Sequence, residues 1–198
     1  MKSILLAAFL LFAALAVVHS QSEHPSGKPV KRTRMFVESM PPPKTLTEMV
    51  ANADAVLIAR ATGRTHLKQG QRPDSPLQST HSFDVEEVIK YSASVPIARE
   101  VLDLDLLGGT KEYETYELSE FVDDWDPIRP NQRYLIFVRQ VSNEFGQRLV
   151  PAWSAAGIFD ITGTSAKSLD KTFRRYNDKT SAQFLGDVQA VAKGAKRP

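Results

Sequence analysis

The chain has 198 residues, a formal net charge of +2 and no cysteine. That length suits one domain with its own hydrophobic core, and the absence of cysteine excludes disulfides, thiol nucleophiles, iron–sulfur clusters and cysteine-ligated zinc. The central part of the chain, residues 45–166, is acidic. We therefore expect no nucleic-acid partner, because a negatively charged segment repels phosphate backbones.

The first 20 residues have the pattern of a secretory signal peptide. Lys2 precedes an apolar run over residues 4–18 that is too short to cross a bilayer, and small residues lead up to the bond between Ser20 and Gln21. The pattern predicts cleavage at this bond, export to the periplasm or the extracellular medium, and no transmembrane anchor in the mature chain. A retained anchor is the alternative. An exported chain without cysteine is more typical of a bacterial protein than of a small eukaryotic secreted domain.

Residues 21–44 are predicted to form a proline-rich basic linker. They contain five prolines, and the run at 41–43 favours a stiff extended segment. A second basic stretch covers residues 167–198 at the end of the chain. The two basic ends are either solvated or in contact with an anionic membrane surface or cell-wall polymer.

Helices are predicted on both sides of the central segment. Thr45 or Thr47 can cap a short helix that has Glu48 in its first turn. From Asp178 onward, apolar residues recur at helical spacing, which predicts a helix in the basic C-terminal tail, 167–198.

Short alternating segments with glycine and proline turns predict that residues 45–166 form a mainly β domain, a small OB-fold-like barrel flanked by these helices. The expected strands are 55–68, 81–91, 101–107, 112–118, 134–138, 148–153 and 157–163. The doubled Glu86-Glu87 predicts a β-bulge, with Phe83, Val85 and Val88 facing inward. The large aromatic residues expected in the core are Phe137, Trp153, Phe159 and Phe184.

The stretch "LDLDLLGGT", residues 102–110, alternates leucine with Asp103 and Asp105. This alternation predicts a strand whose leucines face the core and whose aspartates face solvent. Gly108 and Gly109 match neither a P-loop nor the dinucleotide fingerprint, which require further glycines at fixed spacing before a helix. We therefore expect them to turn a hairpin into the next strand.

Four stretches carry one motif each, in a fixed order along the chain. The first is a short helix ending in Ala-Asp with a strand after it, and the second is an "FxVEEVxK" strand. The third is a Pro-x-x-Pro turn before a Tyr-Leu-x-Phe strand, and the fourth is a final short strand. They are "LTEMVANADAVLIARATG" (46–63), "FDVEEVIKYSA" (83–93), "DPIRPNQRYLIFV" (126–138) and "WSAAGIFDITG" (153–163). The pattern resembles the netrin-like module of tissue inhibitors of metalloproteinases, and more closely its cysteine-free bacterial relatives. The resemblance implies an OB-fold barrel. It carries over no functional residue, because the N-terminal cysteine with which the family inhibitors chelate zinc is missing here.

A tentative binding site is predicted where the acidic residues are densest. Asp123, Asp124 and Asp126 surround Trp125, and Tyr116 lies upstream in the same acidic segment. An indole in such a loop either folds back on the barrel or is exposed as an anchor for a partner. The acidic residues lack EF-hand spacing, so a solvated loop is the default and a weak calcium site the alternative.

His66 and His81 are the second candidate pair. If the strands before and after the 69–80 loop pair symmetrically, the two imidazoles lie opposite each other and offer two ligands for Zn²⁺ or Cu²⁺. Two half-exposed polar residues beside a loop are the simpler interpretation. The motifs of common nucleophilic hydrolases are missing, so no catalytic residue and no cofactor are predicted.

The sequence as a whole favours an exported, non-enzymatic domain that binds a protein, a peptide or an envelope polymer. OB barrels bind along one face and its adjoining loops, which here indicates the loop 69–80 and the segment 108–130. The alternative is an exported hydrolase or metal-dependent enzyme that uses His66 or His81 with a nearby carboxylate.

Overall fold

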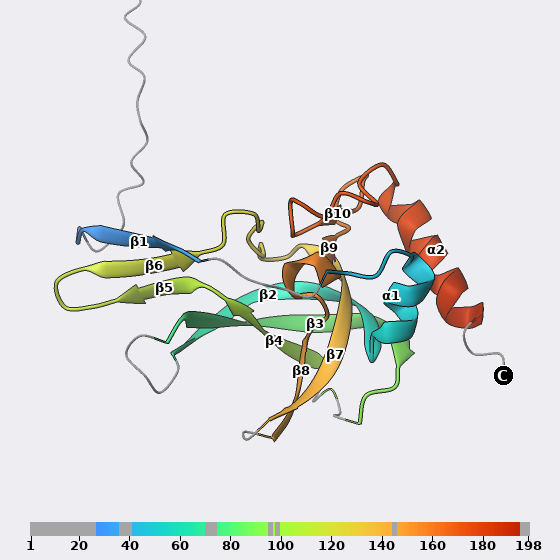
Figure 1. Cartoon of the computed structure of the whole chain (residues 1–198), viewed down its shortest axis with the longest axis horizontal. Coiled ribbons are helices and arrows are strands. Elements are labelled where there is room, and N and C mark those ends of the chain that lie inside the picture. The colour runs from blue at the N-terminus through green and yellow to red at the C-terminus, as the bar shows by residue number, and fades with distance from the viewer. Residues whose placement is uncertain are drawn as a thin grey trace, which may run out of the picture.

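The computed structural model describes residues 27–35, 41–69, 75–94, 97, 100–143 and 146–194 (Figure 1). The expected signal peptide at residues 1–20 lies outside these ranges, as do residues 70–74 of the expected loop. The elements are β1 Val30–Arg34, α1 Leu46–Asn52, β2 Ala55–Gln69, β3 Leu77–Tyr91, β4 Val101–Leu107, β5 Gly109–Glu112, β6 Glu117–Phe121, β7 Arg133–Asn143, β8 Gly146–Pro151, the 3-10 helix η1 Ser154–Gly157, β9 Ile158–Asp160, β10 Lys167–Ser168 and α2 Ser181–Gly194.

Five strands form a partly open barrel in the order of an OB-fold. β2, β3 and β4 follow one another as an antiparallel meander, β2 also pairs with β7, and β7 pairs with β8. β4 and β8 then approach each other, and an ion pair of 3.2 Å between Asp105 and Arg148 bridges their seam. The predicted mainly β, barrel-like fold with a helix near each end is confirmed.

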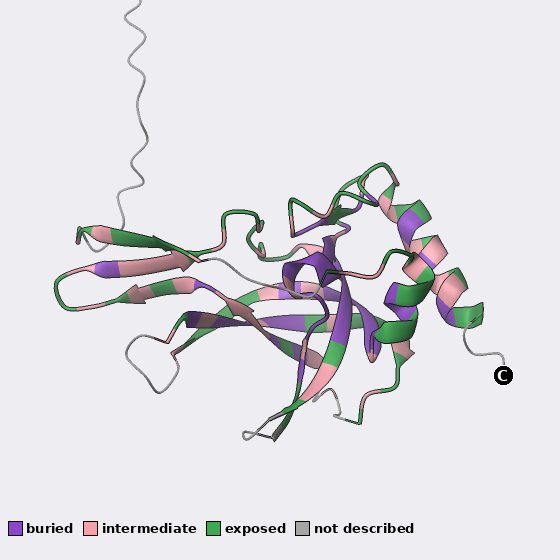
Figure 2. Cartoon of the chain, in the orientation of Figure 1, coloured by how far each residue is buried: buried purple, intermediate pink, exposed green. Residues whose placement is uncertain are grey.

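Two hydrophobic cores lie on the two faces of β2 and β7. Figure 2 shows consecutive buried residues along β7, as expected for a strand covered on both faces. The core inside the barrel contains Phe83, Leu102, Leu104, Tyr134 and Ile136, so the leucine and aspartate alternation of β4 is confirmed. The outer core lies between the sheet and the two helices, and its aromatic members include the four that were expected: Phe137, Trp153, Phe159 and Phe184. Both faces of these strands are buried because α1 and α2 cover the side that faces away from the barrel.

Local signals in the sequence explain the helix boundaries. Thr45 caps α1, and its hydroxyl accepts from the backbone N–H of Glu48 while the Glu48 carboxylate accepts from the N–H of Thr45, which completes a capping box. The expected C-terminal tail is part of the same body, because α2 buries Phe184, Val188 and Ala192 against the outer core. Among the described residues, no helix combines the length and apolar composition needed to cross a membrane.

The two glycines after β4 do not turn a hairpin, and this prediction is wrong. Gly108 has a φ of +101° and bends the chain so that β5 leaves the barrel and joins β6 in a second sheet. A Cβ at Gly108 would lie 2.9 Å from the carbonyl oxygen of Glu120, so only glycine fits this bend. The hairpin turns later, where the N–H of Tyr113 donates to the carbonyl of Tyr116, and the strand expected at 112–118 is therefore interrupted.

Two other expectations are corrected by the strand pairing. Val30–Arg34, inside the expected linker, forms β1 and pairs in parallel with β6, so the second sheet has the order β1-β6-β5. Figure 1 shows this sheet extending away from the barrel on the side opposite the helices. Val88 was expected to face inward but is 51% exposed, because register shifts in the β2–β3 ladder turn it outward.

Candidate binding groove

A groove of about 430 Å³ lies between strands β3 and β4 of the barrel and the segment 120–128. Its lining on the barrel side includes His81 and Leu106, and the opposite side includes Trp125 and Ile128. The volume falls within the roughly 300–1,000 Å³ of typical ligand pockets. The predicted binding segment 108–130 therefore does line a concave surface.

Trp125 is half-buried. The sequence left open whether its indole folds back on the barrel or is exposed as an anchor, and its position combines the two. Its ring packs against the core inside the barrel, and it also lines the groove. The backbone around it is fixed by an isolated bridge to Asp170 and by a 2.7 Å hydrogen bond from the N–H of Asp126 to the carbonyl of Leu169. The indole thus has one face against the barrel and presents apolar surface to the groove.

Two of the three aspartates around Trp125 are engaged with basic side chains. Asp123 forms an ion pair of 2.8 Å with Arg34, the last residue of β1, and Asp126 lies 3.6 Å from the amine of Lys171. Lys171 also donates to the carbonyl of Asp123 at 3.0 Å. Within the described part of the chain no group of three or more histidine, aspartate or glutamate side chains is arranged to hold a metal ion.

Tyr116 does not belong to the groove. It lies at the turn of the β5–β6 hairpin, where its ring stacks on Tyr113 with centroids 4.7 Å apart. The amine of Lys31 in β1 lies 4.0 Å from the Tyr116 centroid, a cation–π contact. The structure therefore separates Tyr116 from Trp125, although the sequence placed both in one candidate site.

The predicted pairing of His66 with His81 is wrong by one residue. His81 lies opposite Thr65, and His66 lies opposite Thr80. Because alternate residues of a strand point to opposite faces, a shift of one residue places the two imidazoles on different faces of the sheet. The two rings therefore do not form the predicted start of a metal site.

His81 alone lies in the groove. Its ring is half-buried between the barrel and the segment 120–128, and burial lowers its pKa below the ordinary range. The imidazole is therefore neutral at neutral pH and adds a polar but uncharged group to the floor. Ser79, two residues before it, donates to the carbonyl of Gly108 at 2.7 Å and so fixes the bend at one end of the groove.

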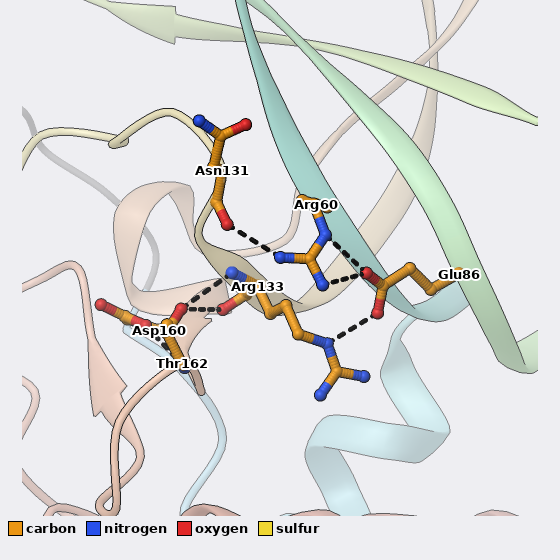
Figure 3. Close-up of polar contacts among 6 residues, drawn as sticks. All are labelled: Arg60, Glu86, Asn131, Arg133, Asp160 and Thr162. Carbon is orange, nitrogen blue, oxygen red and sulfur yellow. Dashed lines mark hydrogen bonds and ion pairs between the residues drawn. The ribbon is translucent and has the colours of Figure 1, made fainter.

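A second polar cluster lies beside Arg60 in the first half of β2, where the predicted bulge is confirmed (Figure 3). The ladder pairs Ile58 with Glu87 and Ala59 with Val85, which leaves Glu86 as the extra residue. The bulge directs the Glu86 carboxylate toward two arginines from neighbouring strands. It accepts from Arg60 Nε at 2.9 Å and from Arg133 Nε at 2.6 Å.

The same cluster fixes the turn that leads into β7. Arg60 Nη1 donates to the carbonyl of Asn131, a residue in the left-handed conformation with a φ of +63°. The backbone N–H of Arg133 donates to the hydroxyl of Thr162, and the N–H of Thr162 donates to Asp160 at 2.8 Å (Figure 3). These bonds fix the turn at Asn131-Gln132 and so set the register in which β7 pairs with its neighbours.

We expect Glu86→Gln to lower the free energy of unfolding by up to about 1 kcal/mol at neutral pH. Arg60 and Arg133 lie directly opposite each other in the β2–β7 ladder, and the variant removes the negative charge that both of them share. Burial raises the pKa of Glu86, but the hydrogen bonds and charges of the two arginines outweigh it and hold the pKa below its ordinary value. The stabilisation by ionised Glu86 is fully present above the ordinary pKa of glutamate. It is lost as the pH falls through the lowered pKa that Glu86 has in the folded chain.

Urea denaturation of both proteins at pH 7 and at about pH 3 checks this prediction. The stability difference should shrink toward the acid pH, as protonation of Glu86 sets in. A difference that stays constant between the two pH values contradicts the assigned role.

Sequence reasoning missed one residue of the groove, Lys171, and assigned another, Ser79 of the predicted binding loop 69–80, to the wrong element. Lys171 comes from the segment after β10, which was assigned to the tail, and it reaches back to Asp123 and Asp126. Ser79 was placed in a loop but belongs to β3, which begins at Leu77. No local pattern identifies either residue, since both acquire their positions through long-range pairing.

The fold and the groove together define a small OB-type β-barrel domain with a second, three-stranded sheet and a partly apolar groove beside one face of the barrel. Comparison of the chain with protein-family models and with curated proteins finds no match.

Proposed function

We propose that this chain is an exported, non-enzymatic binding domain that holds a segment of a protein or peptide in the groove beside Trp125. The observation that carries the proposal is that a half-buried indole on a fixed backbone lines a concave, partly apolar surface. Rigid aromatic side chains of this kind are frequent anchors in binding sites. Export is supported by the signal-peptide pattern of residues 1–20.

The lining indicates the chemistry of the segment that fits. Leu106, Ile128 and Phe121 add apolar surface beside Trp125, so an apolar side chain of the partner fits between them. Asp123 and Asp126 at the rim are already paired with Arg34 and Lys171, so the rim offers polar contacts beside the apolar surface. A peptide or protein segment, which carries apolar side chains on a polar backbone, matches this combination.

The alternative function, a hydrolase or metal-dependent enzyme, was based on the two histidines, which do not form a pair. His66 and His81 point to different faces of the sheet. The pKa of His81 is lowered by burial, with no carboxylate as a contributing neighbour. The netrin-like resemblance is consistent with a binding role, and it remains a proposal that rests on the motif order alone.

We expect Trp125→Ala to abolish specific crosslinking from the groove in the native host. A photoreactive residue at position 121, where Phe121 is 36% exposed at the groove, should capture one partner reproducibly. The matched control carries the same photoreactive residue at the more exposed position 88, which lies beside α2. Equal recovery from both positions, or recovery that survives Trp125→Ala, contradicts the proposal.

The same variant should remain folded. Because only part of the indole packs against the barrel core, we expect a loss of about 1–2 kcal/mol rather than the roughly 3–5 kcal/mol typical of a fully buried tryptophan. Thermal denaturation followed by circular dichroism measures this loss and shows that absent crosslinks do not reflect unfolding.

A further inference from the structure

The basic strand β1 occupies the outer edge of the acidic strand β6. The two strands run in parallel, with Val30 opposite Glu117 and Arg34 opposite Phe121. The ladder is closed at both ends, because the N–H of Glu117 donates to the carbonyl of Pro29 at 3.0 Å and the N–H of Met35 donates to the carbonyl of Phe121 at 2.8 Å. β6 thus accepts an extended segment along its whole length.

The contacts that accompany the β1–β6 ladder are charged side-chain contacts rather than apolar packing. Lys28 forms an ion pair of 2.7 Å with Glu112, and Arg34 forms one of 2.8 Å with Asp123. Between them, Lys31 lies over the ring of Tyr116. Four of the five residues of β1 are exposed, and none of the five belongs to either hydrophobic core.

We propose that the outer edge of β6 is a docking site for an extended basic peptide segment, and that β1 is an internal occupant which such a segment displaces. This inference goes beyond the proposed function, because it concerns a different mode of binding, at an edge of β6 that adjoins the groove and shares Phe121 and Asp123 with it. Addition of a strand to a sheet edge supplies main-chain hydrogen bonds, and alternate side chains supply specificity. Here the specificity comes from the carboxylates of Glu112 and Asp123 and from the Tyr116 ring, which together favour lysine and arginine.

β1 is suited to displacement because little holds it besides the ladder. Exposed ion pairs contribute roughly 0–1 kcal/mol each, and segments with few buried apolar contacts open at low free-energy cost. β1 belongs to the same chain as β6, so it competes with a free peptide as an intramolecular segment, at a raised effective concentration. A free basic segment therefore binds well only where β1 is weakened or where the segment has a higher intrinsic affinity.

The full-length mature chain with Lys28→Glu and Arg34→Glu tests this competition. The probe is a fluorescein-labelled peptide with the sequence of residues 28–35, KPVKRTRM. Fluorescence anisotropy at low salt should show at least tenfold tighter binding of the probe to this variant than to the unaltered chain, because both ion pairs of the internal occupant are lost. Added salt should weaken the binding, since the contacts are charged and exposed.

A control peptide separates the ladder from charge alone. The Met35 N–H faces β6 and alternate peptide groups of a strand face the same neighbour, so the N–H of Thr33 also faces β6. A probe with Thr33→Pro has the same charge but lacks this donor, and we expect it to bind at least tenfold more weakly. Thr33→Pro in the full-length chain supplies a second weakened occupant if the charge-reversed variant folds poorly.

Three outcomes overturn the proposal. The first is the absence of probe binding to both weakened chains. The second is equal binding of the two peptides, which indicates charge attraction without strand addition. The third is a dimer of the unaltered chain, seen by analytical ultracentrifugation and abolished by Thr33→Pro in the chain, which would make a second copy the occupant of this edge.

Discussion

Gly157→Ala is expected to destabilise the chain by about 3 kcal/mol or more, since it forces backbone atoms apart in the outer core. A Cβ at Gly157 would lie 1.8 Å from the carbonyl oxygen of Ala152. The turn between them cannot relax easily. Trp153 and Ser154 are both in the left-handed region, with φ values of +58° and +53°, and the N–H of Ala152 donates to the carbonyl of Phe137 in the neighbouring strand at 2.8 Å.

Gly186→Ala is the matched control for this prediction. It adds the same methyl group in α2, where no atom lies within 4 Å of the new Cβ and φ is not positive. Alanine is the better helix former, so this variant should gain about 0.5–1 kcal/mol. Chemical denaturation of both variants gives the comparison. Similar stabilities of Gly157→Ala and the unaltered chain would contradict the tight turn described at Ala152.

The features that sequence reasoning predicted well are those that depend on neighbouring residues. Alternation of leucine and aspartate in β4 follows from the period of a strand that has one buried face. The capping box of Thr45 and Glu48 satisfies backbone groups within one turn. The doubled glutamate correctly indicated the bulge at Glu86. In each case the physical cause lies within a few residues of its effect.

The features that it missed depend on pairing between distant segments. β1 has a polar sequence and forms a strand only because the edge of β6, more than 80 residues later, supplies hydrogen bonds and carboxylates. The pairing of His66 and His81 was derived from a symmetric 69–80 loop, whereas the ladder next to the loop pairs Gln69 with Leu77 and therefore places His66 opposite Thr80. The position of Trp125 likewise depends on its bridge to Asp170, which no local pattern reveals.

Lys90→Met is expected to cost about 2–3 kcal/mol, because one amine of β3 caps the C-terminal end of α1. Lys90 Nζ donates to three carbonyls, those of Val50 at 2.7 Å, Ala51 at 3.0 Å and Ala53 at 2.6 Å. α1 has only seven residues and no basic residue in its last turn, so these carbonyls depend on β3 for a charged donor.

Burial lowers the pKa of Lys90, and the nearby charge of Asp54 partly opposes this effect. The amine is therefore partly removed from water, and its hydrogen bonds to α1 replace the lost hydration. Methionine keeps most of the apolar stem but removes all three donors, so the variant isolates the capping contribution from packing.

Lys68→Met is the matched control. Lys68 pairs with Asp105 at an exposed position, so this substitution should cost less than about 1 kcal/mol. Equal losses for the two lysines in urea denaturation would show that α1 does not depend on Lys90. A selective loss at Lys90, accompanied by reduced helical signal, would show that the β3 strand holds α1 over the outer core.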